Sequence, residues 1–150
     1  MQKRNEVRLY NVLFPLWMLM LFPQIWLIVL PGNFLIDSLV LVIAMHVLKI
    51  EQRKAFYKRH ILPVFGFGLL ADAIGSAYML LMAFVFELGR MGDEPYITVP
   101  ALLISAVMIF LLNYFVTFRR LDKFLRLRLA LTFALATAPY TFLVPSSWLY

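Results

Sequence analysis

One apolar stretch, residues 61–86, constrains the fold of this chain more than any other feature. It reads ILPVFGFGLLADAIGSAYMLLMAFVF and contains a single carboxylate, Asp72, near its middle. A helix rises about 1.5 Å per residue, so about 20 apolar residues cross the hydrocarbon core of a bilayer. We therefore expect this stretch to form a membrane-spanning helix with an ionisable group close to the midplane.

The composition indicates that the rest of the chain also lies in lipid. Hydrophobic residues make up 63% of the 150 positions and charged residues 15%. A water-soluble domain of this size could not bury that much apolar surface, because much of its surface faces water. The chain contains no cysteine, which excludes disulfides and thiolate metal sites. We predict a single transmembrane domain over residues 1–150.

Five segments are apolar enough to be predicted as transmembrane helices. The sequence Pro31-Gly32-Asn33 predicts a tight turn between the first two, and Pro139 is expected to bend the last one. The predicted fold is an all-α, polytopic membrane bundle with helices over residues 9–30, 34–48, 61–86, 98–118 and 129–144.

Basic residues predict the orientation of this bundle. With five spans, the N-terminus and the loops after the second and fourth segments share one side of the membrane. These three regions hold every lysine and arginine except Arg90. Cytoplasmic loops carry an excess of Lys and Arg, so we predict a cytoplasmic N-terminus and an external C-terminus. The pattern is typical of a protein of the bacterial cytoplasmic (inner) membrane.

Asp72 is the first candidate for a functional side chain, because an ionisable group at mid-membrane depth marks an ion pathway or a paired site. Its helix face also carries small residues, among them Ser76, which would let another helix approach. The structural alternative is that Asp72 hydrogen-bonds between helices. Asn33 and Asp37 share a face of the second segment. Either they are an N-cap and a carboxylate at the helix dipole, or they form the outer mouth of a polar path to Asp72.

A second group of polar residues lies at the predicted cytoplasmic end of the fourth segment and in the basic run that follows. Basic residues here either anchor the chain at the membrane surface or contact anionic lipids. The candidates for lipid or phosphate contact are Asn113, Thr117, Arg119, Arg120, Arg126 and Arg128.

The sequence lacks the motifs of several common enzyme classes. The chain contains no Walker loop, no GxSxG, no HExxH and no glycine-rich dinucleotide turn. No spacing of His, Asp and Glu is typical of a metal site. We therefore expect no catalytic residue, cofactor or metal, and the basic loops explain the positive charge without nucleic acid.

Three functions remain open, and no family resemblance decides between them. The favoured one is a non-enzymatic subunit or accessory component, which packs against another membrane protein or forms a homo-oligomer. The second is a proton- or cation-coupled transporter or channel protomer that uses Asp72. The third is a membrane enzyme acting on a lipid or polyprenyl phosphate, for which Asp122 and His46 are the only acid–base candidates.

Overall fold

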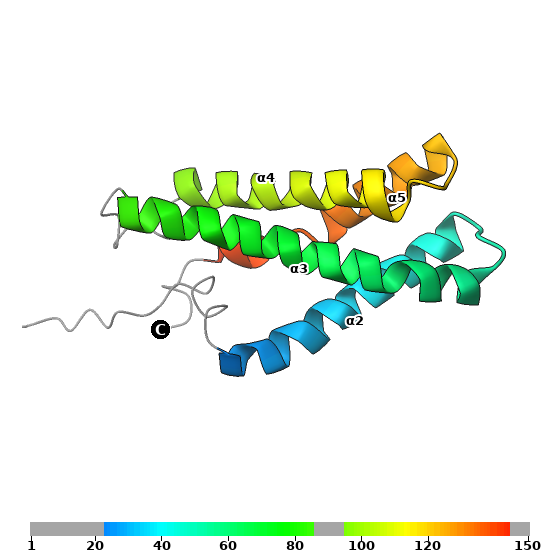
Figure 1. The fold of residues 1–150 in the computed structure, drawn as a ribbon, viewed down its shortest axis with the longest axis horizontal. Helices are drawn as coiled ribbons and strands as arrows, with labels where there is room; N and C mark the ends of the chain where they lie inside the picture. The colour runs from blue at the N-terminus through cyan, green and yellow to red at the C-terminus, as the bar shows by residue number, and fades with distance from the viewer. Residues whose placement is uncertain (1–22, 86–94, 145–150) are drawn as a thin grey trace, which may run out of the picture.

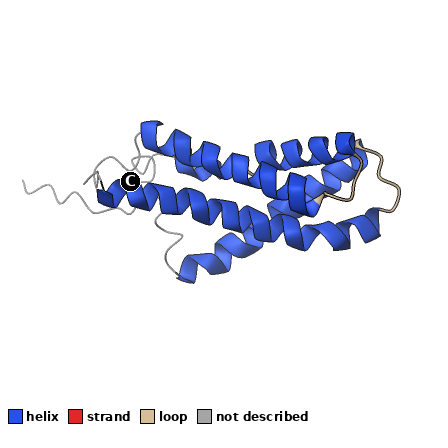
Figure 2. Cartoon of the chain, turned by 45° about the horizontal axis from the view of Figure 1, so that its top comes forward, coloured by secondary structure: helices blue, strands red, loops and turns tan. Residues whose placement is uncertain are grey.

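The chain folds into a bundle of long helices, seen in a computed structural model that describes residues 23–85 and 95–144. Within these residues there are helices and short connections but no strand (Figure 2). The three long helices are α2 (Pro23–Val47), α3 (Arg53–Val85) and α4 (Pro95–Leu112). They are followed by the π-helical turn η1 (Asn113–Thr117), α5 (Lys123–Ala136) and the short 3-10 helix η2 (Tyr140–Leu143).

Among the described residues, three helices are long and apolar enough to cross a membrane, which indicates a membrane protein. Their apolar spans are Trp26–Val47, Arg53–Met82 and Pro95–Thr117. Large side chains on them are uncovered: Leu27 and Ile28 are 77% and 76% exposed. Such exposure is unfavourable in water but natural against lipid. The described residues thus contain three helices long enough to span, compared with the five spans predicted. Residues 9–22 of the first predicted span lie outside the described residues.

The turn predicted at Pro31-Gly32-Asn33 is wrong, because α2 continues through these residues. A proline inside a helix removes one backbone donor. A break would leave several more backbone groups without partners, and lipid offers them none, so the helix persists. Residues 34–48, predicted as a separate helix, are therefore the C-terminal part of α2.

The connection from α2 to α3 is shorter than the predicted basic loop over residues 49–60. α2 ends in a Schellman motif, in which the amide of Lys49 donates to the His46 carbonyl (3.3 Å) and the amide of Ile50 to the Met45 carbonyl (3.0 Å). Lys49 takes the left-handed position of this motif, with φ of 53°. α3 begins at Arg53, so most residues of the predicted loop form its first two turns.

The predicted helix over residues 129–144 is in fact two short helices. α5 begins earlier, at Lys123, where the Asp122 carboxylate accepts a hydrogen bond from the Phe124 amide over 3.1 Å. It ends at Ala136, because Pro139 disfavours helical backbone before it and cannot donate to the helix. With 14 residues, α5 is about 21 Å long and too short to cross the bilayer core alone.

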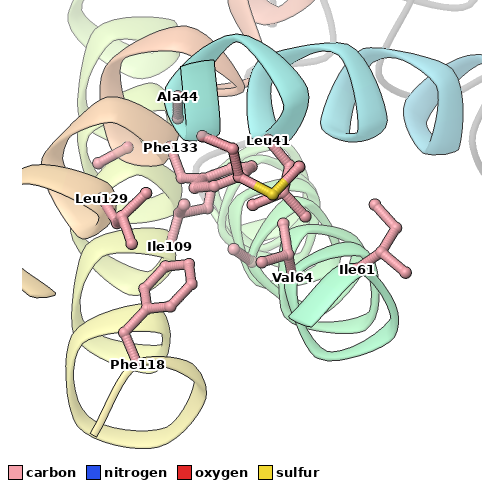
Figure 3. Packing of buried hydrophobic residues seen from close by; sticks show 11 residues of the cluster. Leu41, Ala44, Ile61, Val64, Ile109, Phe118, Leu129 and Phe133 are labelled. Atoms are coloured by element: carbon pink, nitrogen blue, oxygen red, sulfur yellow. The ribbon is translucent and has the colours of Figure 1, made fainter. Parts of the chain in front are cut away.

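Two apolar clusters hold the bundle together. The larger lies toward the α2–α3 and α4–α5 connections and receives side chains from all four α-helices (Figure 3), among them Leu41, Val64, Ile109 and Phe133. The smaller lies toward the other end and consists of Met79, Ile97, Ala101 and Phe142. Because Phe142 belongs to η2, the α5–η2 segment extends from one cluster to the other.

α3 and α4 lie side by side (Figure 1) and are in tight contact at Gly75. The Ser105 hydroxyl of α4 donates to the Ala71 carbonyl of α3 over 3.0 Å. A Cβ atom at Gly75 would clash with Ser105 Oγ and lie 3.2 Å from the Ala101 carbonyl oxygen. Small residues allow such close helix contacts in membranes. This part of the small-residue face of α3 is therefore occupied by the chain itself.

Replacing Gly75 by alanine is expected to destabilise the folded protein by about 1–3 kcal/mol, because the added methyl overlaps Ser105. Gly66→Ala is the matched control, since no heavy atom lies within 4 Å of a Cβ there and alanine favours a helix. Thermal unfolding in detergent, followed by circular dichroism, measures both. Equal midpoints for the two variants would contradict the close contact at Gly75.

Candidate functional site

Two buried carboxyl groups from different helices lie at one cavity in the middle of the bundle. Asp37 of α2 is 5% exposed and Asp72 of α3 is 8% exposed. Both line a cavity of about 340 Å³. Gly68, one turn before Asp72, faces the other carboxyl, because a Cβ there would be in van der Waals contact with Asp37 Oδ2, at 3.5 Å. The cavity therefore lies where α2 passes α3 near Gly68.

Asn33 is the polar neighbour of Asp72. Its side-chain amide donates to Asp72 Oδ2 over 3.5 Å, the upper limit for a hydrogen bond. The other oxygen, Asp72 Oδ1, is buried and has no hydrogen-bond partner among the described residues. An unpaired buried oxygen of this kind is costly. It therefore marks a position where a polar or cationic ligand would be stabilised.

The capping interpretation of Asn33 and Asp37 is wrong, because both lie inside the unbroken helix α2. Asn33, Asp37 and Asp72 line the same cavity. The reason is the continuity of α2 through Pro31, which moves Asn33 and Asp37 from a helix end to a helix middle.

The interruption between α5 and η2 forms the facing wall of this cavity. Ala138 and Pro139 of the interruption are buried. The C-terminal end of a helix carries partial negative charge, and α5 ends here. The residues of this wall that line the cavity are Ala136, Thr137, Ala138, Pro139, Tyr140 and Thr141.

A second cavity of about 240 Å³ adjoins the first and shares Asn33 and Asp72 with it. Ser76, one turn after Asp72, lines this second cavity and is 6% exposed. α2 diverges from α3 at this end of the bundle (Figure 1), and Trp26 of α2 borders the opening. All four predicted intramembrane candidates thus lie around two adjoining cavities.

The predicted group at the basic end is divided between a cavity and the packing of the bundle. Thr117, Arg119 and Arg120 line a cavity of about 320 Å³ beside α3. Asn113 does not line it. The Asn113 side chain is fully buried, and its amide donates to the Ile109 carbonyl over 2.9 Å.

The last two predicted residues of this group make cation–π contacts within the chain. The guanidinium of Arg126 lies 3.9 Å from the centre of the Tyr114 ring, and that of Arg128 lies 4.2 Å from the centre of the Phe124 ring. Neither arginine lines the cavity beside Thr117. The contact of Arg126 with Tyr114 holds α5 against η1, and the contact of Arg128 with Phe124 lies within the first turns of α5.

Sequence reasoning missed Arg59 and His60, which were placed in a loop but belong to α3. Both line the cavity of Thr117, Arg119 and Arg120. His60 is buried, with Nδ1 donating to the Phe56 carbonyl over 2.8 Å. The signal was available, because His60 precedes the buried Val64 by one helical turn, so the helical periodicity extends back into the basic stretch.

The two acid–base candidates for an enzyme make structural contacts instead. His46 Nε2 lies 3.0 Å from a terminal nitrogen of Arg53, and Asp122 caps α5. The described residues contain no group of three or more His, Cys, Asp or Glu side chains that could hold a metal ion.

No protein-family model, curated protein or solved structure matches this chain. Its class therefore follows from the fold and the site alone. The described residues form a helical bundle with three helices able to cross a membrane and a buried pair of carboxyl groups between α2 and α3.

Asn33→Ala is expected to destabilise the protein by about 1 kcal/mol, because it removes the donor to Asp72. In an Asp72→Ala background the same substitution should cost less, since the acceptor is already absent. Chemical unfolding of the wild type, both single variants and the double variant in detergent gives the coupling energy. If Asn33→Ala costs the same in both backgrounds, the two side chains do not interact.

Proposed function

We propose that this protein binds a small cation in the middle of the membrane, between Asp37, Asp72 and the end of α5, and carries it across. The observation that carries the proposal is the burial of two carboxyl groups from different helices at one cavity. Two carboxylates in a medium of low dielectric constant repel each other strongly. A positive charge between them removes that repulsion, and the negative end of the α5 dipole adds to the attraction.

The walls of the cavity favour a proton or an organic ammonium ion over a metal ion. Ca²⁺ takes about six to eight oxygen ligands, and Mg²⁺ demands strict octahedral geometry. Besides the two carboxyls, the lining offers one amide and a few hydroxyls among apolar groups. Its volume, about 340 Å³, is roughly ten times the share of one water in the liquid. A small organic cation fits such a space, with apolar walls around its carbon groups.

The interrupted helix also supports a transport role. Many transporters bind their substrates near the bilayer midplane, where discontinuous helices expose helix ends and backbone groups. In this chain the α5–η2 segment reaches from the larger apolar cluster to the smaller one, and its interruption lines the carboxyl cavity. We take α5–η2 as a fourth, broken crossing of the membrane.

The end of the bundle that holds the α2–α3 and α4–α5 connections is proposed to face the cytoplasm. Both connections lie at the same end (Figure 1). Every lysine and arginine of the described residues lies in these connections or in the first two turns of α3 and α5. Such a bias marks the cytoplasmic side. The predicted positions of the chain termini rest on residues outside the described part.

Single cysteines introduced into this cysteine-free chain test the orientation. Gln52→Cys lies at the basic end and Pro95→Cys at the start of α4, and both positions are exposed. In intact bacterial spheroplasts, a membrane-impermeant maleimide is expected to label Pro95→Cys, and Gln52→Cys only after permeabilisation. The reverse labelling pattern would place the basic end outside.

Asp72→Asn and Asp37→Asn are expected to weaken binding of a hydrophobic cation about tenfold or more, since each removes one half of the negative pair. Ethidium fluorescence with the purified protein measures binding, and a pH-sensitive dye inside proteoliposomes measures proton flux. Asp122→Asn is the matched control, because it removes a carboxylate outside the cavity and asparagine also caps helices well. Its ethidium binding is expected to equal that of the wild type.

The proposal fails if the wild type neither binds ethidium above protein-free membranes nor passes protons. The subunit role would then be preferred. One observation favours it as the second candidate: Ala73 and Ala77, a turn apart on α3, leave a small-residue face at the cavity beside Trp26. A helix of another membrane protein, or of a second copy of this chain, can approach such a face closely.

A further inference from the structure

A cavity lined by arginines lies at the basic end of the bundle, apart from the carboxyl site. It has a volume of about 320 Å³ and lies between the start of α3 and the end of η1. On α3, Arg59 is separated from Asp72 by 13 positions, or about 20 Å along the helix. We call it the arginine cavity; its lining residues are Arg59, His60, Pro63, Phe67, Val116, Thr117, Arg119 and Arg120.

The charged residues that line the arginine cavity are all positive. Arg59 comes from α3, and Arg119 and Arg120 from the connection after η1, while no carboxylate lines the space. All three arginines are exposed, so their guanidinium groups are free to turn toward a bound anion. Guanidinium groups match phosphate oxygens with paired hydrogen bonds. Three of them around one space favour a phosphate group rather than a single carboxylate.

Two uncharged groups add polar contacts to this cavity. Thr117 Oγ1 is buried and has no hydrogen-bond partner among the described residues. It lies at the end of the π-helical turn, a form of helix that often occurs at functional sites. His60 uses Nδ1 to donate to the Phe56 carbonyl, which leaves Nε2 for another partner. A phosphate oxygen would accept from the unpaired Thr117 hydroxyl.

The cavity changes from basic to apolar along the helix axis. On α3, Arg59, Pro63 and Phe67 follow one another at four-residue intervals and all line the cavity, so they form one strip on a helix face. The strip begins with a cation at the basic end and continues with apolar side chains toward the bundle middle. A lipid has this order, with a phosphate at the membrane surface and an acyl chain below it.

We propose that the arginine cavity binds the phosphate group of an anionic membrane lipid, with its acyl chain along Pro63 and Phe67. The ligand contacts are assigned to Arg59, Arg119, Arg120 and the Thr117 hydroxyl. Inorganic phosphate shares the headgroup chemistry but lacks the chain. Binding at this site does not depend on the carboxyl cavity, so either proposal can fail alone.

The test measures the unfolding temperature of the full chain in a non-ionic detergent. Short-chain phosphatidic acid is titrated in, and phosphatidylcholine and inorganic phosphate are run in parallel; a ligand that binds the folded state raises the midpoint. Arg119→Gln/Arg120→Gln is expected to weaken binding of phosphatidic acid about tenfold more than Lys49→Gln/Lys123→Gln. The control pair removes the same charge from the same end but does not line the cavity.

Thr117→Val is the second variant, because it changes no charge and removes only the unpaired hydroxyl. It is expected to weaken phosphatidic acid binding about threefold. Equal losses in the two double variants, together with an unchanged Thr117→Val, would overturn the site and leave only general attraction to a basic surface. If inorganic phosphate stabilises the protein as strongly as phosphatidic acid does, the ligand is not a lipid. The cavity would then remain a phosphate site.

Discussion

Lipid leaves the backbone no outside hydrogen-bond partner, and the rest of this structure depends on that constraint. α2 runs through Pro31 without a turn because a break would expose more unpaired backbone groups than the proline removes. Between α5 and η2, where the helix is interrupted, Ala138 and Pro139 are buried. The same constraint therefore explains both a helix that continues and a helix that stops.

The carboxyl site lies between two regions of apolar packing. The larger cluster includes Leu41 of α2, one turn after Asp37, and the smaller includes Met79 of α3, two turns after Asp72. Packing in these clusters positions α2 against α3, so that Asp37 lies close to Gly68. Apolar packing thus holds two polar groups together that would otherwise avoid each other. The site thus lies between two packed clusters and faces the interruption between α5 and η2.

The sequence predicted the class of fold well and the limits of its helices poorly. The length and apolarity of residues 61–86 indicated a spanning helix, and α3 covers them except Phe86, which lies outside the described residues. The errors lie at Pro31, at the starts of α3 and α5, and near Pro139. Proline signals a break in water, where exposed backbone is hydrated, but in lipid its effect depends on what covers the freed groups. A sequence alone does not contain that information.

The sequence predicted which residues belong to the candidate site but not how they are arranged in space. Asp72 stood out because a carboxylate is rare in an apolar stretch, and Asn33, Asp37 and Ser76 were named with it. Arg59 and His60 were missed, because a run of basic residues resembles a loop until helical periodicity is followed back through it. By itself, the sequence determined that the chain lies in lipid and that its basic residues gather in a few regions, since both follow from composition and order. Only the tertiary structure decided that Asp37 and Asp72 share a cavity facing the end of α5, because a meeting of three segments depends on how the helices cross.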